Sequence, residues 1–232
     1  MQLTGHLTAK KNTITRLLLI GGAAGPLFFI LVFLLEGATR PGYSAWRHFV
    51  SQLSLSSAGW MQVLNFLVCG VLSLGFAIAL RQVLHPGKSA FWGTLLLGTF
   101  SIGLIVAGLF STDPALGYPV GAHMGGPQTL HGTIHGLAGL TVFSSLTAAC
   151  FVMARYFVGK PQWKGWTLYS TITGVIIAVF FIAAMVASVL DGSGVLPDAP
   201  TGFFQRISII AGWGWIALLA IQLLNKRAYA KP

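Results

Sequence analysis

Long apolar runs separated by short polar segments dominate the chain. Six of the runs contain no Lys, Arg, Asp or Glu, and they span residues 17–35, 60–80, 90–111, 130–154, 166–190 and 207–224. Their lengths match the roughly 20 residues that a helix needs to cross the hydrocarbon core of a bilayer. None has the short polar–apolar alternation of membrane barrel strands. The pattern therefore predicts an all-α integral membrane protein, a bundle of six transmembrane helices that forms one domain over residues 1–232.

A second hydrophobic period lies between the first two runs. Trp46, Phe49, Val50 and Leu53 recur at the i, i+3, i+4 and i+7 spacing of one helix face. The other side of that helix would carry polar residues, namely Arg47, His48, Ser51 and Ser54. We expect residues 44–56 to form a short amphipathic helix at the membrane surface, where it either lines the mouth of the bundle or seals the helix ends.

The charged residues are segregated along the chain, and their order predicts the orientation. All four carboxylates follow odd-numbered runs: Glu36, Asp113, Asp191 and Asp198. Eleven of the fourteen Lys and Arg lie in the alternate segments: Lys10, Lys11, Arg16, Arg81, Lys88, Arg155, Lys160, Lys164, Lys226, Arg227 and Lys231. Because cytoplasmic loops of membrane proteins are enriched in Lys and Arg, both termini are predicted to be cytoplasmic. The formal charge of +10 is thus a topology signal, and we expect membrane lipids rather than nucleic acid as partners.

The acids at the helix ends are electrostatically unusual. A helix C-terminus carries partial negative charge, which disfavours a carboxylate there. Either Glu36 and Asp191 simply mark the exit into water, or they are held by Arg40, Arg47, Arg206 or a cation.

The composition agrees with a membrane location. Hydrophobic residues make up 55% of the chain and charged residues only 8%, which is too little charge to solvate the surface of a soluble protein. The expected location is the cell membrane, which is the inner membrane if the source is a bacterium. Cys69 and Cys150 lie inside apolar runs, where helix packing accounts for them without a disulfide or a metal.

The most distinctive polar motif is HGTIH, at the start of the fourth run. His131 and His135 are four residues apart, so both imidazoles lie on one helix face, the spacing at which a helix donates two zinc ligands. A third ligand would be Asp113, at the end of the preceding run, or His123 in the connecting loop. Three protein ligands leave a fourth position open for water, as hydrolysis requires. Zinc is therefore the expected cofactor.

Other interpretations of the histidine pair stay open. Pairs with this spacing also arise by chance, and histidines near a membrane interface often bond to a neighbouring helix. Haem is not expected, because two histidines on one helix cannot flank a porphyrin iron.

Two residues of the first loop are candidates for catalysis. In a metal site, Ser51 or Arg47 would stabilise the oxyanion that develops when metal-bound water attacks. His48 and Ser51 also form a possible base and nucleophile pair, although the sequence shows no acid partner or oxyanion loop for it.

Four segments carry a resemblance to a known family. They are RPGY (40–43), RHFVSQLS (47–54), FSTDP (110–114) and HGTIH (131–135). In this order they resemble the bacterial and archaeal membrane family called domain of unknown function 998, over nearly the whole chain. The resemblance implies six membrane helices and supplies no catalytic residues.

A fainter likeness is to the alkaline-ceramidase-like membrane hydrolases, which combine a Ser, an Asp and an HxxxH pair around zinc. Ser51, Asp113, His131 and His135 would occupy those positions. The chain departs from that pattern in having six predicted spans rather than seven.

Two functional hypotheses follow, and whether the protein is an enzyme stays open. The first is a metal-dependent hydrolase that acts on a lipid-like ester or amide at the outer membrane face. The second is a non-catalytic lipid-binding, sensing or scaffold protein, in which the same residues form a structural polar network. A transporter is less favoured, because spans one, two, five and six show little ionisable or broken-helix character at mid-depth.

Overall fold

The computed structural model describes residues 2–84, 86–122 and 128–229, with side chains described for 12–84, 86–122 and 128–225. Across these residues the chain forms six α-helices that are long and apolar enough to cross a membrane. They are α1 (Gln2–Thr39), α2 (Trp60–Val83), α3 (Lys88–Leu109), α4 (Leu130–Phe157), α5 (Trp166–Gly192) and α6 (Thr201–Tyr229). The predicted all-α fold with six membrane-spanning helices is confirmed, and the protein is a multi-pass membrane protein.

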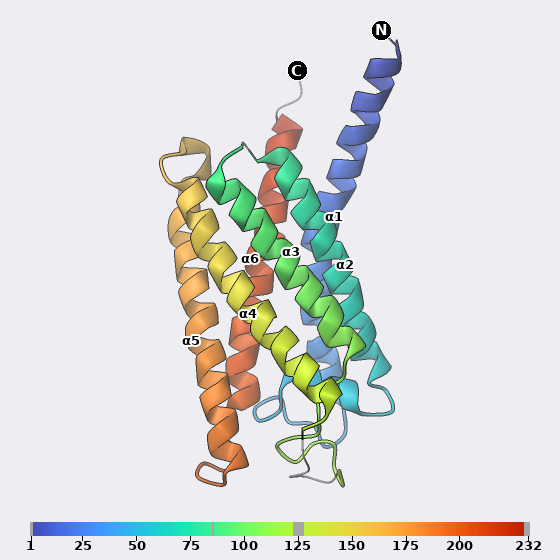
Figure 1. Ribbon diagram of the computed structural model, residues 1–232, viewed down its shortest axis with the longest axis vertical. Coiled ribbons are helices and arrows are strands. Elements are labelled where there is room, and N and C mark those ends of the chain that lie inside the picture. The colour runs from blue at the N-terminus through green and yellow to red at the C-terminus, as the bar shows by residue number, and fades with distance from the viewer. Residues whose placement is uncertain (1, 85, 123–127, 230–232) are drawn as a thin grey trace.

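The helices form a closed ring. Each helix packs on its neighbours in the chain, and α6 returns to pack on α1. Figure 1 shows that α1 begins and α6 ends at the same end of the bundle. Short connections favour antiparallel packing of consecutive helices, so the order of apolar runs along the chain largely determines the order of helices around the ring.

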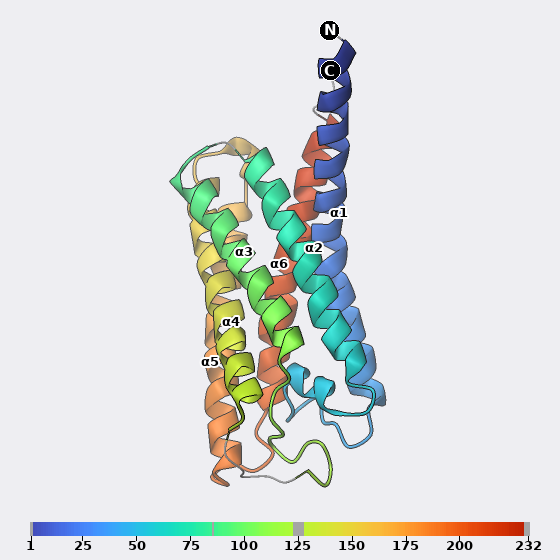
Figure 2. The same cartoon turned by 45° about the vertical axis from the view of Figure 1, so that its right-hand side comes forward.

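The two ends of the bundle differ in length of connection and in charge. Figure 2 shows the described parts of the longer connections, residues 40–59, 110–122, 128–129 and 193–200, gathered at one end. This end also holds the four carboxylates of the sequence, and we call it the carboxylate end. The opposite end, which we call the basic end, has the short connections 84–87 and 158–165. The segregation of charge along the sequence is therefore a segregation between the ends of the fold.

Aromatic packing fills the middle of the ring. Trp213 of α6 is only 1% exposed. Its ring stacks on Phe29 of α1 at 5.5 Å between centroids and meets Phe100 of α3 edge-on at 4.9 Å. The ring centroid of Phe143 of α4 lies 6.0 Å from that of Trp213. Because such pairs each add about 0.5–1.5 kcal/mol beyond area burial, this one indole ties α6 to three other helices.

The helix predicted in the first long connection is present but shorter. It is the 3₁₀ helix η1 (Val50–Leu55), rather than an α-helix over 44–56. Val50 and Leu53 of the predicted apolar stripe are buried, whereas Trp46 is 52% exposed and stacks on Phe203 of α6. The segment thus covers the mouth of the ring.

Side chains of α6 explain why the helix is short. Arg206 Nη1 binds the carbonyl oxygens of Ala45 and His48 at 2.7 and 3.1 Å. Gln205 Oε1 accepts from the backbone N–H of Val50 at 2.7 Å. In an α-helix each of these backbone groups would instead bond a backbone group four residues away. Tertiary hydrogen bonds therefore replace the first turns of the predicted helix.

Candidate functional site

The α3–α4 junction is held by Asp113. Its two carboxylate oxygens accept from the backbone N–H of Thr129 at 2.9 Å and from the Thr129 hydroxyl at 2.6 Å. Thr129 in turn caps α4, because its hydroxyl oxygen accepts from Gly132 N at 3.0 Å. A carboxylate at this position also suits the positive end of the helix dipole. Asp113 therefore anchors the start of α4 to the end of α3.

Gly132, inside the HGTIH motif, makes room for this anchor. A methyl group added at Gly132 would lie 2.8 Å from Asp113 Oδ1 and closer still to Oδ2. Real side-chain contacts are not that short, so the carboxylate and a larger residue cannot share the space. The FSTDP and HGTIH motifs therefore meet through a glycine and a carboxylate.

His135 makes a second contact across the same junction. Its Nδ1 lies 3.1 Å from the carbonyl oxygen of Ala107 and 2.8 Å from that of Phe110. Ala107 lies in the last turn of α3 and Phe110 directly follows the helix, at the end where helical donors run out. Because carbonyl oxygens only accept, Nδ1 carries the proton. Nε2 of the neutral ring is then an acceptor.

The predicted metal ligands do not converge. The part of the chain that the structure describes contains no group of three or more His, Cys, Asp or Glu side chains that could hold a metal ion. His131 is exposed and lies against the ring of Phe110, while Asp113 and His135 are used at the junction. His123, the alternative third ligand, lies outside the described residues.

Arg47, predicted to act on an oxyanion, is engaged by Asp191 at the end of α5 and by Asp198 of the α5–α6 connection. Its Nε and Nη2 each lie 2.7 Å from one oxygen of Asp191. Its Nη1 lies 3.0 Å from Asp198. The bidentate hydrogen bond to Asp191 raises the pKa of Arg47 above its ordinary value. Of the two alternatives left open for Asp191, the structure shows the one in which an arginine holds it.

The first acid is paired as well. Arg40 Nη2 lies 2.8 Å from Glu36 Oε1, one helical turn earlier. Arg40 also binds the hydroxyl of Ser56 and the carbonyl of Ala58. The pair therefore ties the end of α1 to the residues that lead into α2.

Arg206 is a buried cation that, among the described residues, has no carboxylate partner. It is 8% exposed, and the ion pairs of the described residues do not include it. Its guanidinium donates to carbonyl oxygens, including that of Gly202 at 2.9 Å, and to the Tyr43 hydroxyl. Carbonyl dipoles thus solvate its charge without cancelling it, and the surrounding interior keeps a positive potential.

The groups around Arg206 are held in their neutral forms. Burial raises the pKa of Tyr43 to about 12, although Arg206 opposes the shift. Burial lowers the pKa of His48, whose Nε2 donates to the carbonyl of Leu116 at 3.0 Å. His48 Nδ1 accepts from the backbone N–H of Ser44 at 2.9 Å, which only an unprotonated nitrogen can do.

We expect His48 to make the protein less stable in acid. Its folded pKa lies below the unfolded value of roughly 6.5. Its contribution is therefore fully present above about pH 6.5 and is lost as the pH falls through the folded pKa, with a slope of at most about 1.4 kcal/mol per pH unit. Thermal melting of the detergent-purified protein between pH 8 and 4.5 measures this, and His48→Gln should flatten the profile. An unchanged profile in that variant would contradict the assignment.

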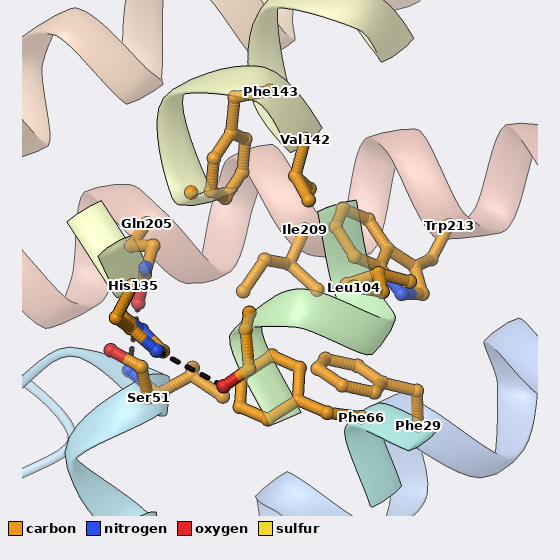
Figure 3. Close-up of a pocket in the computed structure, with 13 residues that line it drawn as sticks. Phe29, Ser51, Phe66, Leu104, His135, Val142, Phe143, Gln205, Ile209 and Trp213 are labelled. Atoms are coloured by element: carbon orange, nitrogen blue, oxygen red, sulfur yellow. Dashed lines mark hydrogen bonds between the residues drawn. The ribbon is translucent and has the colours of Figure 1, made fainter. Parts of the chain in front are cut away.

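A cavity lies directly beneath η1. It has a volume of about 50 Å³, room for on the order of three or four water-sized spheres. Its walls come from η1 and the helices α1, α2, α3, α4 and α6. Figure 3 shows Ser51, His135 and Gln205 gathered at one side of it, with Trp213 and Phe29 at the other. The cavity therefore has one polar wall in an otherwise apolar lining.

The polar wall retains unused hydrogen-bonding atoms. Among the described residues, His135 is hydrogen-bonded through Nδ1 and Gln205 through Oε1. The other polar side-chain atoms of this wall make no hydrogen bond to a described residue: His135 Nε2, Gln205 Nε2 and Ser51 Oγ. Of the predicted site residues, the structure thus brings Ser51 and His135 to one cavity and places Arg47, Asp113 and His131 elsewhere. Gln205 was missed from the sequence, although a polar residue beside Arg206, just before the last apolar run, was a usable signal.

The fold and the cavity define a multi-pass membrane protein with a small polar-walled chamber near one end. The chain belongs to the family described as protein of unknown function (DUF998), whose model matches residues 23–222. It is also similar to the fluoride-specific ion channels FluC of Xanthomonas euvesicatoria pv. vesicatoria (strain 85-10) and Xanthomonas axonopodis pv. citri (strain 306). Each is 31% identical over 131 residues, which cover 54% of this chain and 84% of the channel. No solved structure gives a significant match.

Proposed function

We propose that the protein binds a small monovalent anion of about halide size in the cavity beneath η1 and passes it across the membrane. The observation that carries the proposal is the pairing of unused donors with a nearby uncancelled positive charge. Ser51 and Gln205 line the cavity, and the bonds among the described residues leave out Ser51 Oγ and Gln205 Nε2. Arg206, the next residue along α6, is buried and bonded only to neutral groups.

The electrostatics favour an anion over a cation. A buried guanidinium with no carboxylate partner raises the potential of the low-dielectric interior around it. Hydroxyl and amide donors then supply the directional contacts that replace the hydration shell of an anion. Two acids of the carboxylate end are paired with arginines, Glu36 with Arg40 and Asp191 with Arg47, whereas Asp113 is bonded to Thr129.

Anion binding beside His135 should require that this imidazole be protonated. With Nδ1–H held on two carbonyls, Nε2 of the neutral ring presents a lone pair, which repels an anion. Protonation turns Nε2 into a donor. We therefore expect an anion to occupy the cavity together with one proton on His135, with the Ala107 and Phe110 carbonyls stabilising the charged ring.

The similarity to FluC supports the transport part of the proposal. Those proteins are named as fluoride-specific ion channels, and the matching stretch covers most of their length. The size of the cavity also suits an atomic anion better than a lipid, because about 50 Å³ is far below the 300–1,000 Å³ of ordinary small-molecule pockets.

Anion efflux from proteoliposomes tests the proposal. Vesicles loaded with potassium fluoride or chloride and triggered with a potassium ionophore should release halide, as read by an ion-selective electrode. Ser51→Ala should slow release by about tenfold, because a hydrogen bond to a charged group contributes on the order of 1.5–3 kcal/mol. Ser57→Ala, an exposed serine of the same connection, should match the wild type. Release no faster than from protein-free vesicles would refute anion transport.

A metal-dependent hydrolase has less support. It would need His131, His135 and Asp113 around one zinc ion, whereas Asp113 is bonded to Thr129 and His135 to the end of α3. The non-catalytic hypothesis agrees better with these contacts. Elemental analysis of protein purified without chelator separates the two, since zinc near one equivalent would restore the hydrolase.

The orientation is part of the proposal. The excess of Lys and Arg in the alternate segments supports cytoplasmic termini, which puts the carboxylate end and the cavity at the outer face.

A further inference from the structure

A groove opens at the basic end, between the start of α5 and the last turns of α6. Its volume is about 360 Å³, and Lys164, Trp166, Tyr169, Leu218 and Ile221 contribute to its lining. It lies at the opposite end of the bundle from the cavity beneath η1, so the anion proposal does not account for it.

The lining changes from charged to apolar along the helix axes. Lys164 precedes α5 and is exposed, at the level where the chain leaves the membrane span. Trp166 and Tyr169 follow in the first turn of α5, and aromatic rings of this kind favour the headgroup boundary. Leu218 and Ile221 are 48% and 37% exposed on α6. This order matches that of a phospholipid, from headgroup to acyl chain.

The charge of the groove indicates which headgroup it suits. The four carboxylates of the chain all lie at the other end, and the ion pairs of the described residues leave out Lys164. The neighbouring Lys160 is held over the ring of Tyr156, with 3.1 Å from Nζ to the centroid. Lys164 is thus the cation that the groove itself presents, with no acid to compensate it.

From this juxtaposition we propose that the α5–α6 groove binds one anionic phospholipid. Lys164 contacts the lipid phosphate, Trp166 and Tyr169 flank the headgroup, and the acyl chain runs along Leu218 and Ile221. Basic recesses between membrane helices generally select anionic lipids. A zwitterionic lipid carries its own cation and gains less from Lys164.

Native mass spectrometry of the full-length protein tests the site. The protein is taken from nanodiscs that contain equal amounts of phosphatidylglycerol and phosphatidylcholine, and retained lipids are counted. We expect one phosphatidylglycerol to be retained in preference, and Lys164→Gln to reduce that preference about fivefold. Lys88→Gln is the matched control, because Lys88 is an exposed lysine at the same end, at the start of α3.

Tryptophan fluorescence quenching tests where the lipid binds. Brominated phosphatidylglycerol should quench tryptophan fluorescence more in the wild type than in Trp166→Phe, whereas brominated phosphatidylcholine should quench both equally. Equal retention of the two lipids by the wild type, or an equal loss in Lys88→Gln, would overturn the site in favour of diffuse attraction. Displacement of the lipid by inorganic phosphate would also overturn it, because the recognised group would then be phosphate alone.

Discussion

Arg47→Ala is expected to destabilise the protein by about 2–4 kcal/mol, because it leaves a buried carboxylate without its partner. The side chain of Asp191 is 1% exposed, whereas that of Arg47 is 30% exposed. Removing the arginine therefore strands a charge that water cannot reach. Removing Asp191 instead leaves an arginine that still meets water and Asp198. Thermal or denaturant unfolding in detergent should rank Arg47→Ala as the more damaging of the two changes.

The double variant gives the sharper measurement. Arg47→Ala with Asp191→Ala should be more stable than Arg47→Ala alone, because the stranded charge is gone. Asp198→Asn is the control, since the side chain of Asp198 is 78% exposed and such pairs contribute under about 1 kcal/mol. Asn also tolerates the positive φ of 59° at this position. If the single changes simply add in the double variant, the coupling inferred here is absent.

Gly132→Ala is expected to cost about 1–3 kcal/mol, the range for forcing an extra methyl group into a filled space. The added carbon would meet the Asp113 carboxylate, which is fixed by two bonds to Thr129. Either the carboxylate leaves Thr129 or α4 shifts away from the end of α3. Unfolding in detergent measures the loss.

The same helix offers a matched control. Gly136 is one turn further along α4, and an added methyl group there meets nothing within 4 Å. Gly136→Ala should leave stability unchanged or raise it by up to about 1 kcal/mol through helix propensity. Similar losses at Gly132 and Gly136 would mean that helix flexibility, rather than the carboxylate contact, explains the first.

The membrane helices could be predicted from the sequence because one property, the length of an apolar run, decides where a helix crosses the bilayer. Apolar length controls insertion, and α2 and α4 begin at Trp60 and Leu130 as the pattern predicts. The start of α1 at Gln2 was not predicted, since hydropathy marks where a helix crosses lipid and does not register its continuation into water. The length of the helix in the first loop was overestimated for a related reason. Periodicity registers the apolar stripe of 46–53, and it carries no information about side chains of α6 that compete for the backbone.

The candidate site was harder to predict because its contacts are long-range. Arg47 and Asp191 lie 144 positions apart, so the sequence suggests that the acid needs a cation without identifying which one. The histidine pair presents a different difficulty. An imidazole that binds zinc and one that donates to the end of a helix require the same residue at the same spacing. Only the position of the Ala107 and Phe110 carbonyls separates the two for His135.

The closed ring of helices has a consequence for biosynthesis. Consecutive helices can pair as they leave the ribosome, but the α1–α6 seam forms only after the last helix has been made. That helix supplies Trp213 to the centre, and Arg206 and Gln205 to the first loop. Until then, α1 and α5 each have an unmatched face in the lipid, and the first loop lacks its hydrogen-bond partners. We therefore expect a chain truncated before residue 201 to remain open and incompletely folded.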